Sequence, residues 1–455
     1  MPDGNCRSLA ARPEWAHEYR AKLRTADAAV AELGARSRVY LGGNAATPRA
    51  LVSALARRGT EVRGMRASHV LLLDDAPLAG SDGTSQLEHR PYFVGPADRD
   101  AVNEGRAGYV PCHLSEIPRI LREDPAGLDA ALLMTSPPDS HGFLSLGVEV
   151  LASLAAAEAA RRVVVQVNER MPRVFGNAFL HVSEVDAIVE ADHDLPELRP
   201  PVASQVDRAI AEHVVGLVPD RATLQLGIGA VPDTVCSMLD EHGIRHLGIH
   251  SEMISDGVMR AVRRGVVTGA HKTRHRRKVV TTFVLGTREL YDWVHENPGI
   301  EAHPCDHTNA LGVAAQNDRL VAVNSAISVD LTGQVNADSI GSKIYSGVGG
   351  QVDFIRAAAS SRGGVPIIAL PSMAHGGRVS RIVAELTPGA GVVTSRADVH
   401  HVVTEYGVAR MFGRSLPERA EALIGIAHPD VRDDLANAFD ARFRSLEGVA
   451  QPAYN

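Results

Sequence analysis

The segment Thr223-Leu224-Gln225-Leu226-Gly227-Ile228-Gly229-Ala230-Val231-Pro232 sets the fold class of this chain. Its first four residues are typical of a buried strand, and two glycines follow at once. Glycine permits a tight turn, and proline is tolerated in a first helical turn, where its missing N–H would have no partner. The segment therefore predicts a strand, a turn and a helix, whose free N–H groups attract phosphate or other anions.

Short apolar runs alternate with helical stretches on both sides of this unit. We expect a helix over the alanine-rich residues 150–162 and a hairpin over 329–336, around Thr332-Gly333. The other expected strands are 39–41, 69–73, 130–134, 163–167, 279–285, 320–323, 366–370 and 391–394. This alternation favours an α/β fold with largely parallel sheets.

The length of the chain and its prolines predict the domain organisation. A chain of 455 residues is too long for one ordinary core. The stretch 194–201, Asp-Leu-Pro-Glu-Leu-Arg-Pro-Pro, opposes both helix and sheet. We therefore expect an N-terminal α/β domain at 1–193, a linker at 194–204, and a C-terminal α/β domain at 205–455 that carries the glutamate discussed below.

Composition excludes several classes of function. A net charge of -7 and 4% aromatic residues give no reason to expect nucleic acid or an anionic membrane as partner. No apolar run approaches eighteen residues, and the first residues lack the apolar core of a signal peptide. The four cysteines, Cys6, Cys112, Cys236 and Cys305, are scattered, which argues against zinc and against a disulfide scaffold. We expect a cytoplasmic protein that forms a homodimer or a higher homo-oligomer.

Two segments carry possible chemistry. Glu252 lies in His250-Ser-Glu-Met-Ile-Ser-Asp-Gly257, directly after a short apolar strand, and Ser346-Gly-Val-Gly-Gly-Gln351 follows about one hundred residues later. A carboxylate at a strand end can be a nucleophile, and glycine-rich backbone can bring N–H groups to a developing oxyanion. Together they suggest acyl chemistry through a covalent glutamyl intermediate. Taken singly, Glu252 could be a capping acid and the glycines a structural turn.

Other patterns are weaker. The dinucleotide-binding fingerprint lacks its third glycine, with Pro232 in that position, so we reject a standard NAD site. Glu405 is a rival carboxylate that suits a structural role better than that of a nucleophile. His271 and His275 stand four residues apart, but basic residues lie between them and no acidic partner is near. We therefore interpret this segment as a solvated basic loop and expect no metal.

Eight segments of the chain form an ordered set of motifs: residues 108–116, 136–147, 227–232, 250–257, 333–336, 347–354, 394–407 and 426–430. Together they resemble the acetyl-CoA hydrolase/transferase family and, within it, the 4-hydroxybutyrate CoA-transferase branch. The resemblance covers nearly the whole chain, and its motifs occur together in order.

The resemblance implies two similar CoA-transferase-type α/β domains with the active site at their interface. It implies that Glu252 is the nucleophile, that Gly350 and Gly349 supply N–H groups, and that Ile327 lies against CoA or the thioester. It further implies that CoA is bordered by a cofactor-binding turn comprising Gly227, Ile228, Gly229, Ala230 and Val231. The implied enzyme moves CoA from an acyl-CoA to a short-chain carboxylic acid such as 4-hydroxybutyrate, acetate or butyrate. It has no tightly bound cofactor and no metal, and it needs no separate base because a carboxylate is ionised near neutral pH.

Three alternatives stay open at this point. The same residues could serve an acyl-CoA hydrolase with water as acceptor. The chain could also be a binding protein for CoA or a nucleotide that lacks catalysis. An NAD-dependent dehydrogenase is disfavoured by the incomplete fingerprint.

Overall fold

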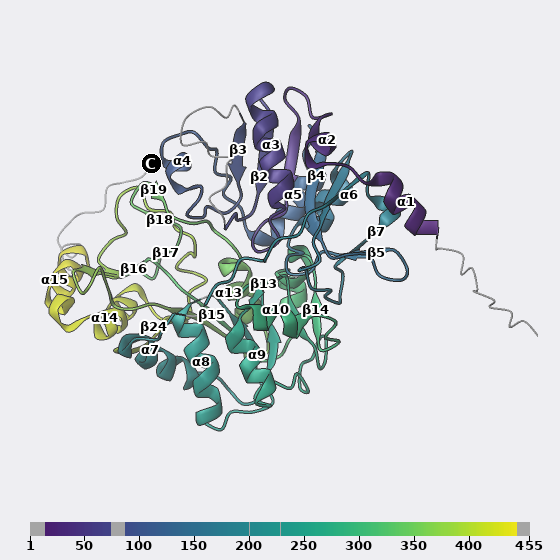
Figure 1. Cartoon of the computed structure of the whole chain (residues 1–455). Coiled ribbons are helices and arrows are strands. Elements are labelled where there is room, and N and C mark those ends of the chain that lie inside the picture. Colours follow the sequence, from purple (N-terminus) through teal and green to yellow (C-terminus); the bar gives the residue numbers. More distant parts are fainter. Residues whose placement is uncertain (1–13, 74–86, 200, 228, 444–455) are drawn as a thin grey trace, which may run out of the picture.

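The computed structural model describes residues 14–73, 87–199, 201–227 and 229–443, and it contains two α/β halves, each built on its own sheet (Figure 1). The first half holds a six-stranded parallel sheet. Its strands, in spatial order, are β3 (Glu88–Pro91), β2 (Arg66–His69), β1 (Arg38–Leu41), β4 (Ala130–Thr135), β6 (Val163–Val167) and β8 (Ala187–Glu190). All residues of β4 and β6 are buried, as expected for parallel strands covered on both faces.

The second half holds an eight-stranded sheet that is parallel except for its last pair. Its strands, in spatial order, are β14 (Ile300–Ala302), β12 (Val279–Thr281), β10 (Gly248–His250), β9 (Thr223–Leu226), β15 (Leu320–Asn324), β20 (Val365–Ala369), β24 (His401–Thr404) and β25 (Gly407–Arg410). The strand expected at 223–226 is therefore central, with β10 and β15 on its two sides.

Helices cover the sheets of both halves. Those of the first half are α1 (Glu14–Lys22), α2 (Ala26–Val30), α3 (Arg49–Glu61), α4 (Arg99–Asn103), α5 (Ile117–Glu123) and α6 (Ser153–Ala159). Those of the second half are α7 (Gln205–Val215), α8 (Ala230–Glu241), α9 (Asp256–Arg263), α10 (Arg288–Val294), α11 (Cys305–Thr308), α12 (Leu311–Ala314), α13 (Gln351–Ser360), α14 (Leu416–Ile426) and α15 (Arg432–Phe443). No helix in the described ranges has the length and apolarity that a membrane crossing requires.

Most expected elements are confirmed, and two strands were wrong. The hairpin forms from β16 (Ser328–Asp330) and β17 (Val335–Asn336), whereas the helix over 150–162 is shorter, as α6. The strand expected at 69–73 is β2, which ends at His69; the apolar residues after it are buried in a loop. Residues 391–394 form no strand, and only Thr394 makes an isolated bridge, to Val335. The run after His69 reflects burial of Val70 and Leu72 in a loop, whereas Val392 is exposed, so its run carries no burial signal.

The sequence places the domain boundary between the two sheets. The first sheet ends with β8 at Glu190 and the second begins with β9 at Thr223. The limits 1–193, 194–204 and 205–455 stay a prediction within that interval.

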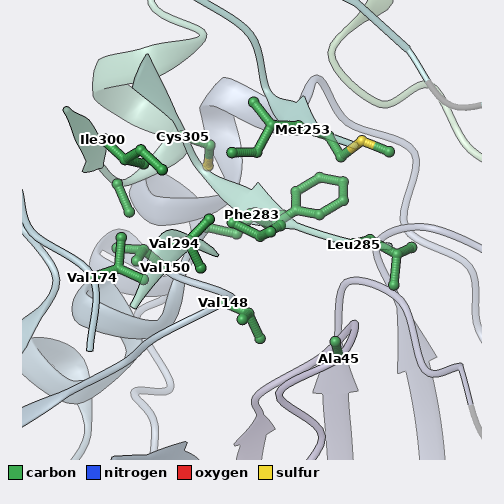
Figure 2. Close-up of a cluster of buried hydrophobic side chains, with 14 of the residues drawn as sticks. Ala45, Val148, Val150, Val174, Met253, Phe283, Leu285, Val294, Ile300 and Cys305 are labelled. Atoms are coloured by element: carbon green, nitrogen blue, oxygen red, sulfur yellow. The ribbon is translucent and has the colours of Figure 1, made fainter. Parts of the chain in front are cut away.

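The two halves share one hydrophobic core. Figure 2 shows Val148 and Val150, which follow β5 (Phe143–Ser145) in the first half, beside Phe283 and Cys305 of the second half. The backbones also pair, because Val150 N–H donates to the Thr282 carbonyl at 3.0 Å and Val284 N–H donates to the Val148 carbonyl at 2.8 Å. The halves are therefore packed as one body along residues 148–151. The three described cysteines are free thiols.

Candidate active site

A cavity of about 360 Å³ lies between the two halves. It opens at the carboxyl ends of β9, β10 and β15, which is where parallel α/β sheets usually hold ligands. The first half contributes Asn44, Val70, Leu71, Phe93, Leu114 and Leu151 to its wall. No histidine or cysteine occurs among the described residues that line it. The cavity itself therefore offers no set of soft metal ligands.

Glu252 lines this cavity from the segment between β10 and β11 (Met253–Ile254). Its backbone carbonyl accepts hydrogen bonds from Thr282 N–H at 2.9 Å and Phe283 N–H at 3.0 Å. Its neighbour Ser251 is held to β9, since the hydroxyl donates to the Leu226 carbonyl at 2.9 Å. The backbone at Glu252 is thus fixed from two directions.

The carboxylate of Glu252 has one direct polar partner among the described side chains. Asn309 Nδ2, just after α11, donates to Glu252 Oε2 at 2.8 Å and lies 3.4 Å from Asp353 Oδ2. Burial raises the pKa of Glu252 to about 7; the Asn309 hydrogen bond opposes this rise, and the negative charge of Asp353 adds to it. Desolvation therefore disfavours the charged form that the sequence-based reasoning assigns to this glutamate at neutral pH.

Gly350 lies directly against that carboxylate. A Cβ built at Gly350 would overlap Glu252 Oε2 and Asn309 Nδ2, so a larger residue here would displace these side chains. Gly349, with φ near +61°, adopts a conformation that favours glycine. The sequence analysis grouped these two glycines with Glu252 in one site, and the structure brings all three residues together at the cavity.

The loop 346–351 is also tied to the first half. Leu114 N–H donates to the Gly349 carbonyl at 3.0 Å, and Val348 N–H donates to the Tyr109 hydroxyl at 3.2 Å. Asp353, in the first turn of α13, accepts hydrogen bonds from Ser115 N–H at 3.1 Å and from its hydroxyl at 2.8 Å. Burial raises the pKa of Asp353, and the Ser115 hydrogen bonds oppose that rise. The position of this loop therefore depends on residues 109–115.

The turn at residues 227–231, expected to border CoA, reaches the same cavity. Gly227, Gly229, Ala230 and Val231 all line it, and Ile228 lies outside the described residues. α8 begins at Ala230, and Gly229 caps it with φ near +117°. The expected turn and helix start are confirmed, and the first turn of α8 faces the cavity.

Two other residues singled out in the sequence are not among the described residues that line the cavity. Ile327 is absent from the described lining, although Asn324 and Ser325 just before it are present; its N–H donates to the Asn336 carbonyl at 2.8 Å. Glu405 accepts hydrogen bonds from Ser372 N–H at 2.8 Å and from its hydroxyl at 2.6 Å, which suits the structural role expected for it.

Sequence reasoning missed three polar residues of the site: Asn309, Asp353 and Asn44. Asn44 follows β1, lines the cavity and is 1% exposed, yet neither its side-chain oxygen nor its nitrogen has a hydrogen-bond partner among the described residues. Buried amides without partners are rare in proteins. The signal for Asn44 in the sequence was its position just after the apolar strand 39–41, where asparagine is common as an ordinary turn residue.

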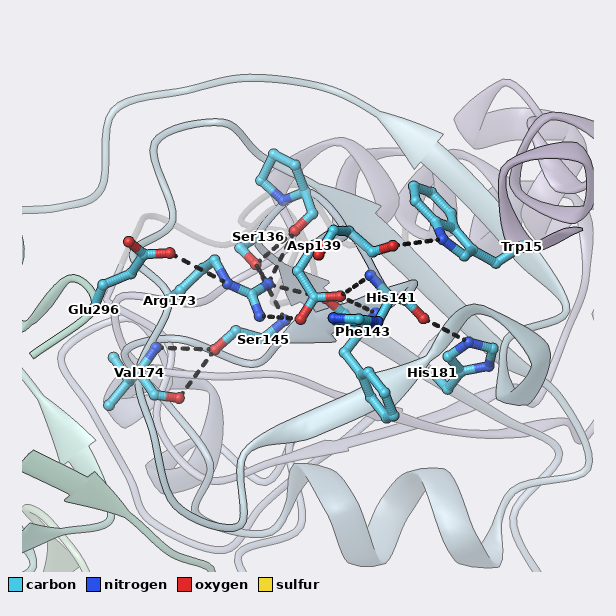
Figure 3. A network of polar contacts seen from close by, with 12 residues as sticks. Trp15, Ser136, Asp139, His141, Phe143, Ser145, Arg173, Val174, His181 and Glu296 are labelled. Carbon is cyan, nitrogen blue, oxygen red and sulfur yellow. Dashed lines mark hydrogen bonds and ion pairs between the residues drawn. The ribbon is translucent and has the colours of Figure 1, made fainter. Parts of the chain in front are cut away.

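The motif at 136–147 contributes to the structure of the turn and to the contact between the halves. Figure 3 shows the Asp139 carboxylate accepting hydrogen bonds from the backbone N–H groups of His141, at 2.8 Å, and Phe143, at 3.0 Å. Arg173 pairs with the same carboxylate at 2.9 Å and lies 3.9 Å from Glu296 of the second half. This network, which lies outside the described cavity wall, holds the turn and joins the halves.

Comparison with known proteins agrees with this arrangement. The acetyl-CoA hydrolase/transferase N-terminal domain matches residues 8–197, and the C-terminal domain of the same family matches residues 286–439. The 4-hydroxybutyrate coenzyme A transferase of Clostridium kluyveri is 47% identical over 94% of this chain and 100% of its own length.

Two solved structures are similar along nearly the whole chain. RipA from Yersinia pestis is 37% identical, with a TM-score of 0.87 over 94% of this chain and 99% of its own. The 4-hydroxybutyrate CoA-transferase of Porphyromonas gingivalis is 38% identical, with a TM-score of 0.82 over 94% of this chain and 100% of its own. From both domain matches and these relatives, the chain belongs to the acetyl-CoA hydrolase/transferase family.

Proposed function

We propose that this protein is a CoA-transferase that moves CoA from an acyl-CoA thioester to a short-chain carboxylic acid through a glutamyl-CoA thioester on Glu252. The observation that carries the proposal is the contact of the Glu252 carboxylate with Gly350 and Asn309 in a cavity between the halves. The relatives from Clostridium kluyveri and Porphyromonas gingivalis, named as 4-hydroxybutyrate CoA-transferases, support the same activity.

The proposed reaction begins with attack of the Glu252 carboxylate on the thioester carbonyl. The C–S bond breaks, leaving an acyl-glutamyl anhydride and CoA thiolate. The thiolate then attacks the glutamyl carbonyl and releases the acyl group as a carboxylate, so that CoA is held on Glu252 as a thioester. An acceptor carboxylate reverses both steps, takes the CoA and frees Glu252.

The environment of Glu252 suits this chemistry. A desolvated carboxylate loses less hydration when it attacks, and backbone N–H groups at 349–350 can stabilise the oxyanion that forms. One such donor contributes about 3–4 kcal/mol in comparable sites. Exclusion of water by the apolar wall, which includes Leu71, Phe93 and Leu151, would protect the glutamyl thioester from hydrolysis.

The substrates have separate places in this proposal. The first turn of α8 and the cofactor-binding turn would bind the anionic part of CoA, since free N–H groups at a helix start attract phosphate. The unpartnered amide of Asn44 would hydrogen-bond the carbonyl or carboxylate of the short acyl group. No tightly bound cofactor is needed, because the reacting atoms belong to Glu252 and the two substrates.

Trapping the intermediate tests the proposal directly. The protein is incubated with acetyl-CoA or butyryl-CoA without acceptor, treated with borohydride and digested with trypsin. Reduction of a glutamyl thioester converts the carboxyl of Glu252 into an alcohol, which should appear on the peptide from His246 to Arg260. Prior addition of acetate should discharge the thioester and protect the peptide.

Two variants make this experiment decisive. Glu252→Gln should give no labelled peptide, whereas Glu405→Gln, which removes a carboxylate outside the cavity wall, should still be labelled. An unlabelled wild-type protein that transfers CoA normally would refute the covalent route. Steady loss of acyl-CoA without acceptor would instead indicate a hydrolase, and no turnover at all would indicate a binding protein.

A further inference from the structure

Three histidines gather at the edge of the second sheet, outside the cavity wall. His275 comes from the basic loop 270–278, His303 follows β14, and His307 lies in α11. We call these three residues the histidine cluster. The sequence had grouped His275 with His271, but the His271 ring packs against His246 instead, with centroids 5.7 Å apart.

The cluster has the geometry of a set of metal ligands. The Nε2 atoms of His275 and His307 are 3.0 Å apart, and the His303 ring lies 4.6 Å from that of His307 and 5.0 Å from that of His275. One nitrogen from each ring lies within 4.8 Å of the others. Two imidazole nitrogens on a tetrahedral zinc ion, with bonds of about 2.0–2.1 Å, are about 3.3 Å apart. Small side-chain rotations would therefore complete the site.

The Glu301 carboxylate contacts two of the three histidines. Glu301, in β14, has Oε2 at 2.8 Å from His275 Nδ1 and 3.3 Å from His303 Nε2, and its Oε1 lies 3.5 Å from Lys278 Nζ. A carboxylate that accepts the Nδ1 proton leaves the Nε2 lone pair free to bind a metal, an arrangement common around zinc. This partner orients His275 toward His307.

The rings are also accessible. The side chains of His275 and His303 are 17% and 14% exposed, and His307 is partly exposed as well. An ion can therefore enter from solvent, and water can fill the remaining coordination position.

We propose that His275, His303 and His307 bind one divalent transition-metal ion of the zinc class, with Glu301 as the hydrogen-bonding partner of His275. The site is separate from the reaction and would act on it indirectly. His307 lies in α11, and Asn309, directly after that helix, donates to Glu252. A bound ion would therefore fix the helix that positions Asn309.

A second group of possible ligands fits a metal less well. His69, His89 and Asp98 are buried, with Asp98 Oδ1 at 3.4 Å from His89 Nε2 and 3.8 Å from His69 Nε2. Neither histidine has a hydrogen-bond partner at Nδ1 among the described residues, so nothing orients either ring for a metal. We interpret this group as a buried polar network.

The test uses the untagged full-length protein, because a polyhistidine tag would bind the same ions. After removal of metal with EDTA and dialysis, Zn²⁺ is titrated by calorimetry, and Co²⁺ is added to record its visible absorption. We expect one ion bound per chain and a higher Tm with Zn²⁺ than with EDTA. The visible absorption of Co²⁺ should be that of an ion with low coordination number.

Variants assign the site. The double variant His303→Gln/His307→Gln should lose at least about 100-fold in Zn²⁺ affinity, and Glu301→Gln should lose about 10- to 100-fold, as is typical when a ligand's supporting carboxylate is removed. The control His246→Gln/His271→Gln, a surface pair on neighbouring segments, should bind as the wild type does. Circular dichroism checks that each variant is folded.

Two results would overturn the proposal. One is the absence of any heat or Tm change with Zn²⁺ at concentrations up to about 100 μM, which is far above the Kd of protein zinc sites. The other is unchanged affinity in the folded double variant, which would place the ion elsewhere.

Discussion

Replacing Glu252 by glutamine should stabilise the folded protein at alkaline pH, in addition to removing the proposed nucleophile. The physical reason is the burial that raises the pKa of this carboxyl from 4.5 to about 7. Ionising the buried group costs free energy that ionising it in the unfolded chain does not. Glutamine keeps the shape and polarity of the protonated acid and never ionises.

The sign and size follow from the two pKa values. Below pH 4.5 the carboxyl is protonated in both folded and unfolded chains, so it adds no pH dependence. Between 4.5 and about 7 the folded chain keeps a proton that the unfolded chain releases, so each rise in pH destabilises the wild type. The full difference corresponds to about 3 kcal/mol at about 1.4 kcal/mol per pKa unit. Because the side chain is partly exposed to the cavity, we expect about 2–3 kcal/mol.

Thermal or urea unfolding of the wild type and Glu252→Gln, at about pH 5 and about pH 8, measures this difference. The variant should gain several degrees in Tm at the higher pH and much less at the lower one. Glu421→Gln, at an exposed position on α14, controls for the loss of one negative charge. An equal stability difference at both pH values would show that the Glu252 carboxylate is well solvated in the free protein, and the reasoning would fail.

Four further predictions concern activity. Transfer measured as kcat/KM should rise about tenfold per pH unit below pH 7 and level off above it, because Glu252 must be ionised to attack; a profile flat between pH 5 and 8 would contradict this. Gly350→Ala should lower kcat by about 10²- to 10³-fold, because its Cβ would displace the carboxylate, whereas Gly312→Ala, where a Cβ meets open space, should not. Asn309→Ala should move the pH profile upward by about one unit, since the charged form of Glu252 loses a hydrogen bond; an unmoved profile would assign Asn309 to structure alone. Gly229→Val should raise the KM for acyl-CoA by about tenfold or more, because valine is strained at φ near +117° and would obstruct the turn; an unchanged KM would separate this turn from CoA binding.

The parts of the fold that the sequence could predict are those with local patterns. The strand, turn and helix at 223–241 follow from apolar residues, glycines and a proline that are adjacent in the chain. The hairpin at 328–336 is equally local. The loop after His69 was misassigned because burial of Val70 and Leu72 makes a loop as apolar as a strand.

The candidate site divides in the same way. Glu252 and the glycines at 349–350 stand in distinctive sequence contexts, and they meet in the structure. Asn309 has no such context, and Asp353 lies in the motif 347–354 without a role that the motif reveals; both roles arise only when α11 and α13 approach Glu252. The histidine cluster has the same origin, since His275 and His307 are distant in sequence and β14 brings them together.

The bonds between residues 109–115 and the glycine-rich loop bear on protein engineering. Exchanging the first half with that of a relative, by joining chains near 194–204, would leave the nucleophile and the glycines untouched. The exchange leaves the loop in place only where the relative has the same residues at 109, 114 and 115, because Tyr109, Leu114 and Ser115 fix Val348, Gly349 and Asp353. Chimeras that share the motif 108–116 should therefore keep the loop in place, whereas chimeras that differ within it should fold yet work poorly until the segment 109–115 is restored.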